Sequence, residues 1–143
     1  MRQPNYRVGW YIPEQIAALT HFHAEVTAED FLGVVQAGQK LLTTVSNAFH
    51  IIIDNRKVGM TSPASLSQIQ QMVPYMNHPL LRWVVVIKPE HLVLNAESLP
   101  IEQEGEIRLK NVSSLSAGLR YLRQTIEDLH WHQADLTFFP DPD

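Results

Sequence analysis

The sequence predicts a single α/β domain, with a mixed sheet that begins as an antiparallel hairpin, continues as parallel strands, and carries helices packed on it. Two short runs, Phe49–Ile53 and Trp83–Ile87, are almost continuously apolar, which is typical of strands covered on both faces of a parallel sheet. Segments with helical apolar periodicity alternate with these runs. The length of 143 residues and the 45% of apolar residues suit one compact domain.

The first two elements form the expected hairpin. Tyr6–Tyr11 and Ile16–Phe22 are rich in strand-forming residues, and a short turn that contains Pro13 separates them. We expect the two segments to pair antiparallel.

A helix is expected to follow the hairpin. Thr27 can cap its first turn, and Glu29 and Asp30 lie where the helix dipole favours acids. Gly38 falls on the apolar stripe of this helix, so we expect the helix to pack closely on a neighbour at that point.

The second half of the chain alternates between helix and strand. Ser62–Ser65 opens a helix that Pro74 kinks or ends. The stretch Pro89–Pro100 predicts a short helix with poorly defined ends. Glu106–Lys110 alternates cleanly between polar and apolar residues, which indicates an edge-type strand, and Ser114 can cap a final helix.

The domain is expected to span residues 1–129 and to be followed by an irregular tail, residues 130–143. Trp131, Phe138 and Phe139 are hard to place in a small core, so we expect an exposed interaction site there, or packing on another subunit in a homodimer. The residues predicted to lie in the core are Val35, Ile51, Ile53, Ile69, Val84, Val86, Leu119 and Leu122.

The composition excludes several classes of function. Eleven basic against fifteen acidic residues leave a net charge of −4, which argues against nucleic acid and anionic membranes as partners. The absence of cysteine excludes disulfides, thiolate catalysis and cysteine-bound metal sites. The apolar runs are too short to span a bilayer, and no apolar signal core follows the first residues, so we expect a cytoplasmic protein.

Five local strings within residues 5–129 occur in an order that is typical of one protein family. They are Trp10–Pro13, Thr27–Phe31, His50–Asp54, His78–Trp83 and Ser114–Leu122. In this order they resemble the STAS superfamily, and within it the SpoIIAA-like (STAS/SEC14-type) bacterial proteins. The resemblance implies a STAS-like domain that binds partners or ligands and usually performs no chemistry.

Antagonists of anti-sigma factors in this superfamily are switched by phosphorylation of a serine near the start of a helix that follows a central strand. The matching region here is residues 54–65. It lacks the Asp-Ser-Ser-Gly string of the antagonists and has Thr61, Ser62 and Ser65 instead.

The turn Asp54-Asn55-Arg56-Lys57 is the best polar constellation in the sequence. It leaves the most buried predicted strand at its carboxyl end, where open α/β sheets bind ligands. The free amides of the next helix, which begins near Ser65, and the two basic side chains are suited to an anion. An ordinary solvated turn is the alternative interpretation.

Histidine pairs suggest a metal site as a further alternative. His21 and His23 are two positions apart on the predicted strand and would therefore share a face, and His130 and His132 form a second pair. The sequence has no HExxH, GxSxG, GxGxxG or P-loop motif, so no cofactor is expected.

We therefore expect a non-enzymatic regulatory or protein-interaction module that resembles anti-sigma-factor antagonist domains and binds its partner through residues 54–65. One alternative is a SEC14-type protein that binds a small apolar ligand between helices and sheet. The other is a metal-dependent or hydrolytic enzyme. A well-packed interior with an exposed patch would favour the first function, a preformed apolar cavity the second, and converging histidines the third.

Overall fold

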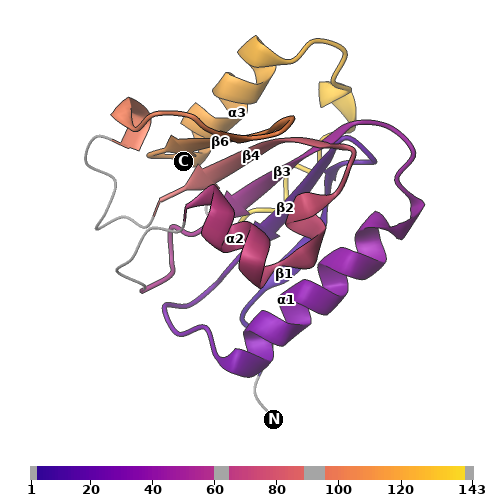
Figure 1. Ribbon diagram of the computed structural model, residues 1–143. Coiled ribbons are helices and arrows are strands. Elements are labelled where there is room, and N and C mark those ends of the chain that lie inside the picture. Colours follow the sequence, from indigo (N-terminus) through magenta and orange to yellow (C-terminus); the bar gives the residue numbers. More distant parts are fainter. Residues whose placement is uncertain (1–2, 60–64, 89–95, 141–143) are drawn as a thin grey trace.

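Six strands form one mixed sheet in the computed structural model, which describes residues 3–59, 65–88 and 96–140 (Figure 1). The strands are β1 (Arg7–Ile12), β2 (Ile16–Thr20), β3 (Phe49–Asp54), β4 (Leu81–Ile87), β5 (Glu102–Glu104) and β6 (Ile107–Val112). Their order across the sheet is β1-β2-β3-β4-β6-β5. The β1–β2 and β5–β6 pairs are antiparallel, and the β2–β3, β3–β4 and β4–β6 pairs are parallel. The predicted fold class and the predicted hairpin are therefore confirmed.

Helices cover both faces of the sheet. They are α1 (Ala28–Leu41), α2 (Leu66–Met72) and α3 (Leu115–Thr125), with short 3-10 helices η1 (Leu42–Thr44), η2 (Pro74–Asn77), η4 (Ala96–Ser98) and η5 (Trp131–Gln133). In Figure 1, α1 and α2 lie on one face and α3, in gold, lies on the other.

The predicted helix starts form as capped ends. Thr27 caps α1 by accepting a hydrogen bond from the Asp30 backbone amide at 3.0 Å, and the Asp30 carboxylate accepts one from the Thr27 amide at 3.0 Å. Gly38 packs directly against the Tyr75 ring. A Cβ atom at this position would overlap the ring. The glycine is therefore needed for the close packing of α1 on η2.

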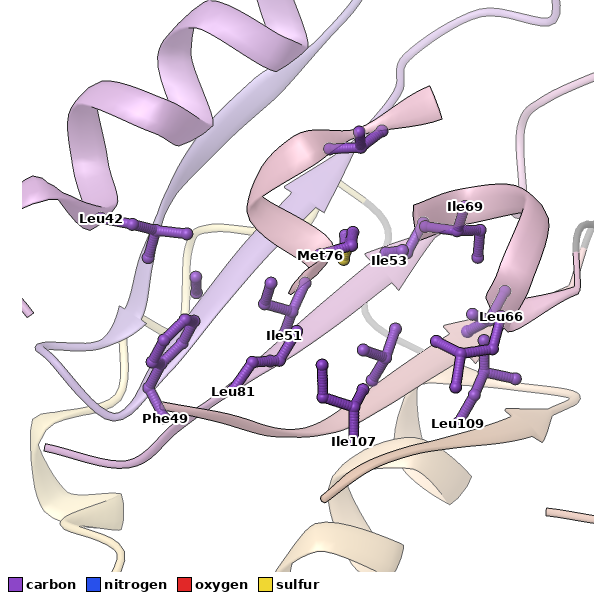
Figure 2. Close-up of a cluster of buried hydrophobic side chains, with 14 residues drawn as sticks. Leu42, Phe49, Ile51, Ile53, Leu66, Ile69, Met76, Leu81, Ile107 and Leu109 are labelled. Carbon is purple, nitrogen blue, oxygen red and sulfur yellow. The ribbon is translucent and has the colours of Figure 1, made fainter. Parts of the chain in front are cut away.

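Two apolar clusters, one on each face of the sheet, make up the core. The cluster under α1 and α2 is shown in Figure 2 and includes Leu42, Phe49, Ile51, Ile53, Leu66, Ile69, Met76, Leu81, Val84, Val86, Ile107 and Leu109. The second cluster lies under α3 and includes Ile52, Val85, Ile87, Val112, Leu115 and Leu122. All the predicted core residues belong to these clusters, with Val35 and Leu119 only partly buried.

One predicted element differs from the structure, one strand was not predicted, and one expected helix lies largely outside the described residues. The Glu106–Lys110 strand was expected at an edge, but β6 has β4 on one side and β5 on the other. Its neighbour β5 is three residues long and reads Glu-Gln-Glu, so it carries no apolar signal. The helix expected over Pro89–Pro100 falls largely outside the described residues, and the part that is described contains only η4.

The expectation of an exposed aromatic tail is wrong. Phe138 and Phe139 are only 4% and 5% exposed and belong to the cluster under α3. The Phe139 ring packs on Tyr11 at a centroid distance of 5.4 Å, and the Asp135 amide donates to the Tyr11 carbonyl at 2.8 Å. Arg7 donates to the Phe138 carbonyl at 2.5 Å. The tail therefore completes the core beside the edge strand β1.

Replacing Ile51 tests the core most simply, because this side chain lies 4% exposed in the middle of β3. We expect Ile51→Ala to lower the free energy of unfolding by about 2–5 kcal/mol in chemical denaturation. The matched control is Leu136→Ala, since Leu136 is 80% exposed and its loss is expected to change stability by about 0.5 kcal/mol or less. Equal effects of the two substitutions would contradict the assignment of Ile51 to the core.

Candidate functional site

The carboxyl ends of the parallel strands β2, β3, β4 and β6 meet at one edge of the sheet, and most of the predicted site residues lie there. Asp54 ends β3, and Asn55, Arg56 and Lys57 form the turn that follows it. Ser65 caps α2. Thr61 and Ser62 lie outside the described residues.

Asp54 and Arg56 form an internal clamp at this edge. Asp54 is 3% exposed and accepts hydrogen bonds from the Thr20 hydroxyl at 2.8 Å and from the Arg56 amide at 3.2 Å. The Arg56 guanidinium binds both carboxylate oxygens of Asp54, each at 2.9 Å, and the Arg56 side chain is 9% exposed. The Arg56 fork that was expected to face an anion therefore neutralises a buried carboxylate, and the Thr20 hydroxyl bonds the same carboxylate to β2.

The amino end of α2 also has internal partners. The Ser65 hydroxyl accepts from the Gln68 amide at 3.2 Å, and the Gln68 side chain accepts from the Ser65 amide at 2.9 Å. The Leu66 amide donates to the Glu102 carboxylate at 2.9 Å. A side chain of β5 thus supplies the negative charge at this seven-residue helix.

The histidines expected to share a strand face do not do so. The strand β2 ends at Thr20, before both of them. His21 is buried with Nδ1 2.7 Å from the Asn5 carbonyl oxygen, whereas His23 is exposed. Within residues 3–59, 65–88 and 96–140, no three histidine, aspartate or glutamate side chains lie close enough to hold a metal ion.

A charged groove opens elsewhere, on the face of the sheet that carries α3. It has a volume of about 380 Å³ and lies at the amino ends of β3 and β4. We call it the Trp83 groove; its lining includes His50, Arg82, Trp83, Gln103, Glu106 and Arg108. None of these residues was expected to form a site.

Strand register brings four of the lining residues into one row. His50 on β3 is paired with Trp83 on β4, Trp83 with Arg108 on β6, and Arg108 with Gln103 on β5. Neighbouring strands are about 4.8 Å apart, so the row crosses the sheet as a continuous polar and aromatic strip. The sheet itself therefore builds the floor of the groove.

A bulge at the start of β4 adds Arg82 to this floor. Phe49 pairs with Leu81 and His50 pairs with Trp83, so Arg82 is the extra residue. Leu81 packs under α1 and α2, whereas Trp83 packs under α3. The break in alternation lets Arg82 and Trp83 line the same side of the sheet.

His50 is neutral near pH 7 and presents a fixed tautomer. Burial, with a smaller effect from the charge of Arg82, lowers the pKa of His50 to about 4. Its Nδ1 accepts a hydrogen bond from the Trp83 amide at 3.3 Å, so the proton of the neutral ring lies on Nε2. Among the described residues none accepts a hydrogen bond from Nε2, and His50 lines the groove. The groove thus contains an uncharged N–H donor.

Arg82 is held by both backbone and side-chain acceptors. Its Nη1 donates to the Pro79 carbonyl at 2.8 Å and to the Leu81 carbonyl at 3.1 Å. Its Nη2 lies 3.1 Å from a carboxylate oxygen of Glu106, whose side chain is 76% exposed. The carbonyls fix the orientation of the guanidinium, and Glu106 pairs with it at the solvent side.

Aromatic rings beside the groove are flanked by cations. Trp83 and Tyr121 pack edge to face at a centroid distance of 5.2 Å. The Arg108 guanidinium lies 5.7 Å from the Trp83 ring centre, and the Lys110 ammonium lies 5.7 Å from that of Tyr121. Burial raises the pKa of Tyr121, so its hydroxyl stays protonated.

Two sequence signals pointed toward this groove. The clean alternation of Glu106–Lys110 puts Arg108 and Lys110 on one face of their strand, and His50 interrupts an apolar run. The row itself depends on the pairing of β3, β4, β6 and β5 and on the bulge at Arg82, neither of which the pattern of a single segment specifies.

Comparison with known proteins adds no family to this description: no family model, no curated protein and no solved structure matches the chain. Among the helices that the structure describes, none has the length and apolar character needed to cross a membrane.

The Asp54–Arg56 clamp is expected to be structural, because each substitution breaks a bidentate ion pair at a buried carboxylate. We expect Asp54→Asn and Arg56→Met each to lower the free energy of unfolding by about 3–5 kcal/mol. In the double variant the two losses are expected to be non-additive, with a coupling of about 0.5–3 kcal/mol. Losses below about 0.5 kcal/mol for both single variants in urea denaturation would contradict the clamp.

The lowered pKa of His50 predicts a dependence of stability on pH. Between about pH 6.5 and pH 4 the unfolded chain binds a proton at His50 that the folded chain does not, so stability falls as the pH falls through this window. The stabilisation is complete above pH 6.5, and its loss below pH 4 amounts to about 3 kcal/mol. We expect His50→Asn, which keeps an acceptor for the Trp83 amide, to remove this part of the pH dependence in denaturant titrations. The same slope in both proteins would show that His50 is not held neutral.

Proposed function

We propose that this protein is a non-enzymatic module that acts in the cytoplasm and binds another protein through the Trp83 groove. The observation that carries the proposal is the row of His50, Trp83 and Arg108 with Arg82 beside it. Tryptophan, tyrosine and arginine are the residue types that dominate binding energy at protein interfaces. Arg82, Trp83 and Arg108 line one concave surface, and Tyr121 packs against the Trp83 ring beside it.

The packing of the interior favours protein recognition over an apolar ligand. The apolar cavity between α1 and the sheet, lined by residues such as Leu19, Leu41 and Ile51, has a volume of about 20 Å³. That is room for about one water molecule, whereas ligand sites occupy roughly 300–1,000 Å³. A SEC14-type ligand at this place would require α1 to move away from the sheet.

The partner surface that we propose is the groove and not residues 54–65. Arg56 is bound to Asp54, and the amino end of α2 is occupied by Ser65 and Glu102. The proposal keeps the regulatory role that the STAS resemblance implies. In this proposal the protein exerts that role by binding its partner at the Trp83 groove.

Two charge reversals on the same face of the protein test the proposal. Arg108 lines the groove, and Arg120 is an exposed arginine on α3. Partners are captured by cross-linking in a lysate of the source organism, identified by mass spectrometry, purified and titrated against each variant. We expect Arg108→Glu to weaken binding at least tenfold, which is the loss of a charge-assisted contact, and Arg120→Glu to leave it unchanged.

Equal binding by both variants, with unchanged thermal melts, would contradict the groove as the partner surface. A native mass spectrum of the purified protein provides a second check. A stoichiometric lipid-sized adduct would replace the proposal with the apolar-ligand function.

A further inference from the structure

We propose that the Trp83 groove recognises an acidic segment of its partner, and that a carboxylate of this segment takes the place of Glu106 on Arg82. This inference rests on the proposed function and specifies the chemistry of the partner.

The groove already accommodates a carboxylate. Glu106 lies 3.1 Å from Nη2 of Arg82 and keeps 76% of its side chain exposed. Exposed ion pairs of this kind contribute little to stability, so Glu106 can be displaced at small cost. A partner carboxylate would meet the same guanidinium with the same charge and geometry.

Arg82 stays in position when Glu106 leaves. Its Nη1 donates to the carbonyl groups of Pro79 and Leu81, which are parts of the backbone that leads into β4. The bulge at this point keeps Arg82 on the side of Trp83. The donor is therefore preorganised, which reduces the entropy lost on binding.

Other donors in the groove favour the same ligand. The neutral His50 ring offers its Nε2 proton, and Arg108 adds a second positive charge beside Trp83. Of the acidic residues at the β5–β6 end, Glu102 and Glu104 pair with Leu109 and Ile107, so they lie on the opposite face of the sheet from Arg108. Once Glu106 is displaced, the groove presents two guanidinium groups and one N–H donor to an anion.

The test uses the full chain and a fluorescein-labelled ten-residue peptide of aspartate, glutamate and glycine, with fluorescence anisotropy as the readout. The same peptide with asparagine and glutamine in place of the acids is the neutral control. We expect the acidic peptide to bind, more weakly as salt is raised, and the neutral peptide not to bind.

The decisive variant is Glu106→Gln, which removes the competing carboxylate. We expect it to tighten binding of the acidic peptide by about two- to fivefold, the equivalent of an exposed ion pair. Glu29→Gln is the matched control, because Glu29 is exposed in the first turn of α1 on the other face and changes the net charge equally. Arg82→Gln is expected to weaken binding at least tenfold. Thermal melts check that each variant is folded. If Arg82→Gln does not fold, the comparison of Glu106→Gln with Glu29→Gln decides the test.

Three results would overturn the inference. One is equal affinity of Glu106→Gln and Glu29→Gln for the acidic peptide. Another is binding of a phosphoserine peptide while the acidic peptide does not bind. The third is binding of succinate, detected by calorimetry, while the peptide does not bind, which would assign the groove to a small dicarboxylate. If any of these occurs and Arg108→Glu still weakens binding of the captured partner at least tenfold, the proposed function stands and only the acidic segment is rejected.

Discussion

The parallel pairing of β3 with β4 is the constraint on which the rest of the structure depends. Both strands are apolar toward α1 and α2 on one side and toward α3 on the other, so neither strand can shift by one residue without exchanging its two sets of side chains. Ile51 therefore stays opposite Val84, and Ile52 opposite Val85. The same register places His50 beside Trp83 at the amino ends of these strands.

The Trp83 groove is a consequence of this register and of one irregularity. The bulge at Arg82 changes the face toward which β4 directs its side chains, and β6 and β5 extend the row with Arg108 and Gln103. The opposite edge of the sheet, where parallel α/β folds usually bind ligands, is stabilised from within by the Asp54–Arg56 clamp. Among the described residues, the Asp54–Arg56 clamp and the contacts of Ser65 and Glu102 with α2 stabilise the carboxyl edge, whereas the groove at the amino end presents charge to solvent.

Elements with a strong local signal could be predicted from the sequence. Thr27 and Ser114 cap their helices as expected, and the two apolar runs are adjacent parallel strands. The short β5 could not be predicted, because its three polar residues are held by pairing with β6 and not by their own pattern. The burial of Phe138 and Phe139 depends on a long-range contact with Tyr11 at the start of the chain, which local periodicity does not encode.

For the candidate site, the residue types correctly predicted a charged turn at Asp54–Lys57. They did not predict that the Arg56 guanidinium would bind Asp54. The Trp83 groove joins residues from four strands, so it is visible only once the strand register is known.

Nuclear magnetic resonance of the protein with its captured partner tests the location of the binding surface most directly. In a sample with ¹⁵N-labelled histidine and tryptophan side chains and backbone amides, we expect the partner to shift the Nε2 resonance of His50 and the indole resonance of Trp83. The amides of residues 54–57, which belong to the internal clamp, are expected to stay unchanged. Shifts confined to residues 54–57, with His50 and Trp83 unaffected, would contradict binding at the Trp83 groove and would place the partner surface at the carboxyl edge of the sheet.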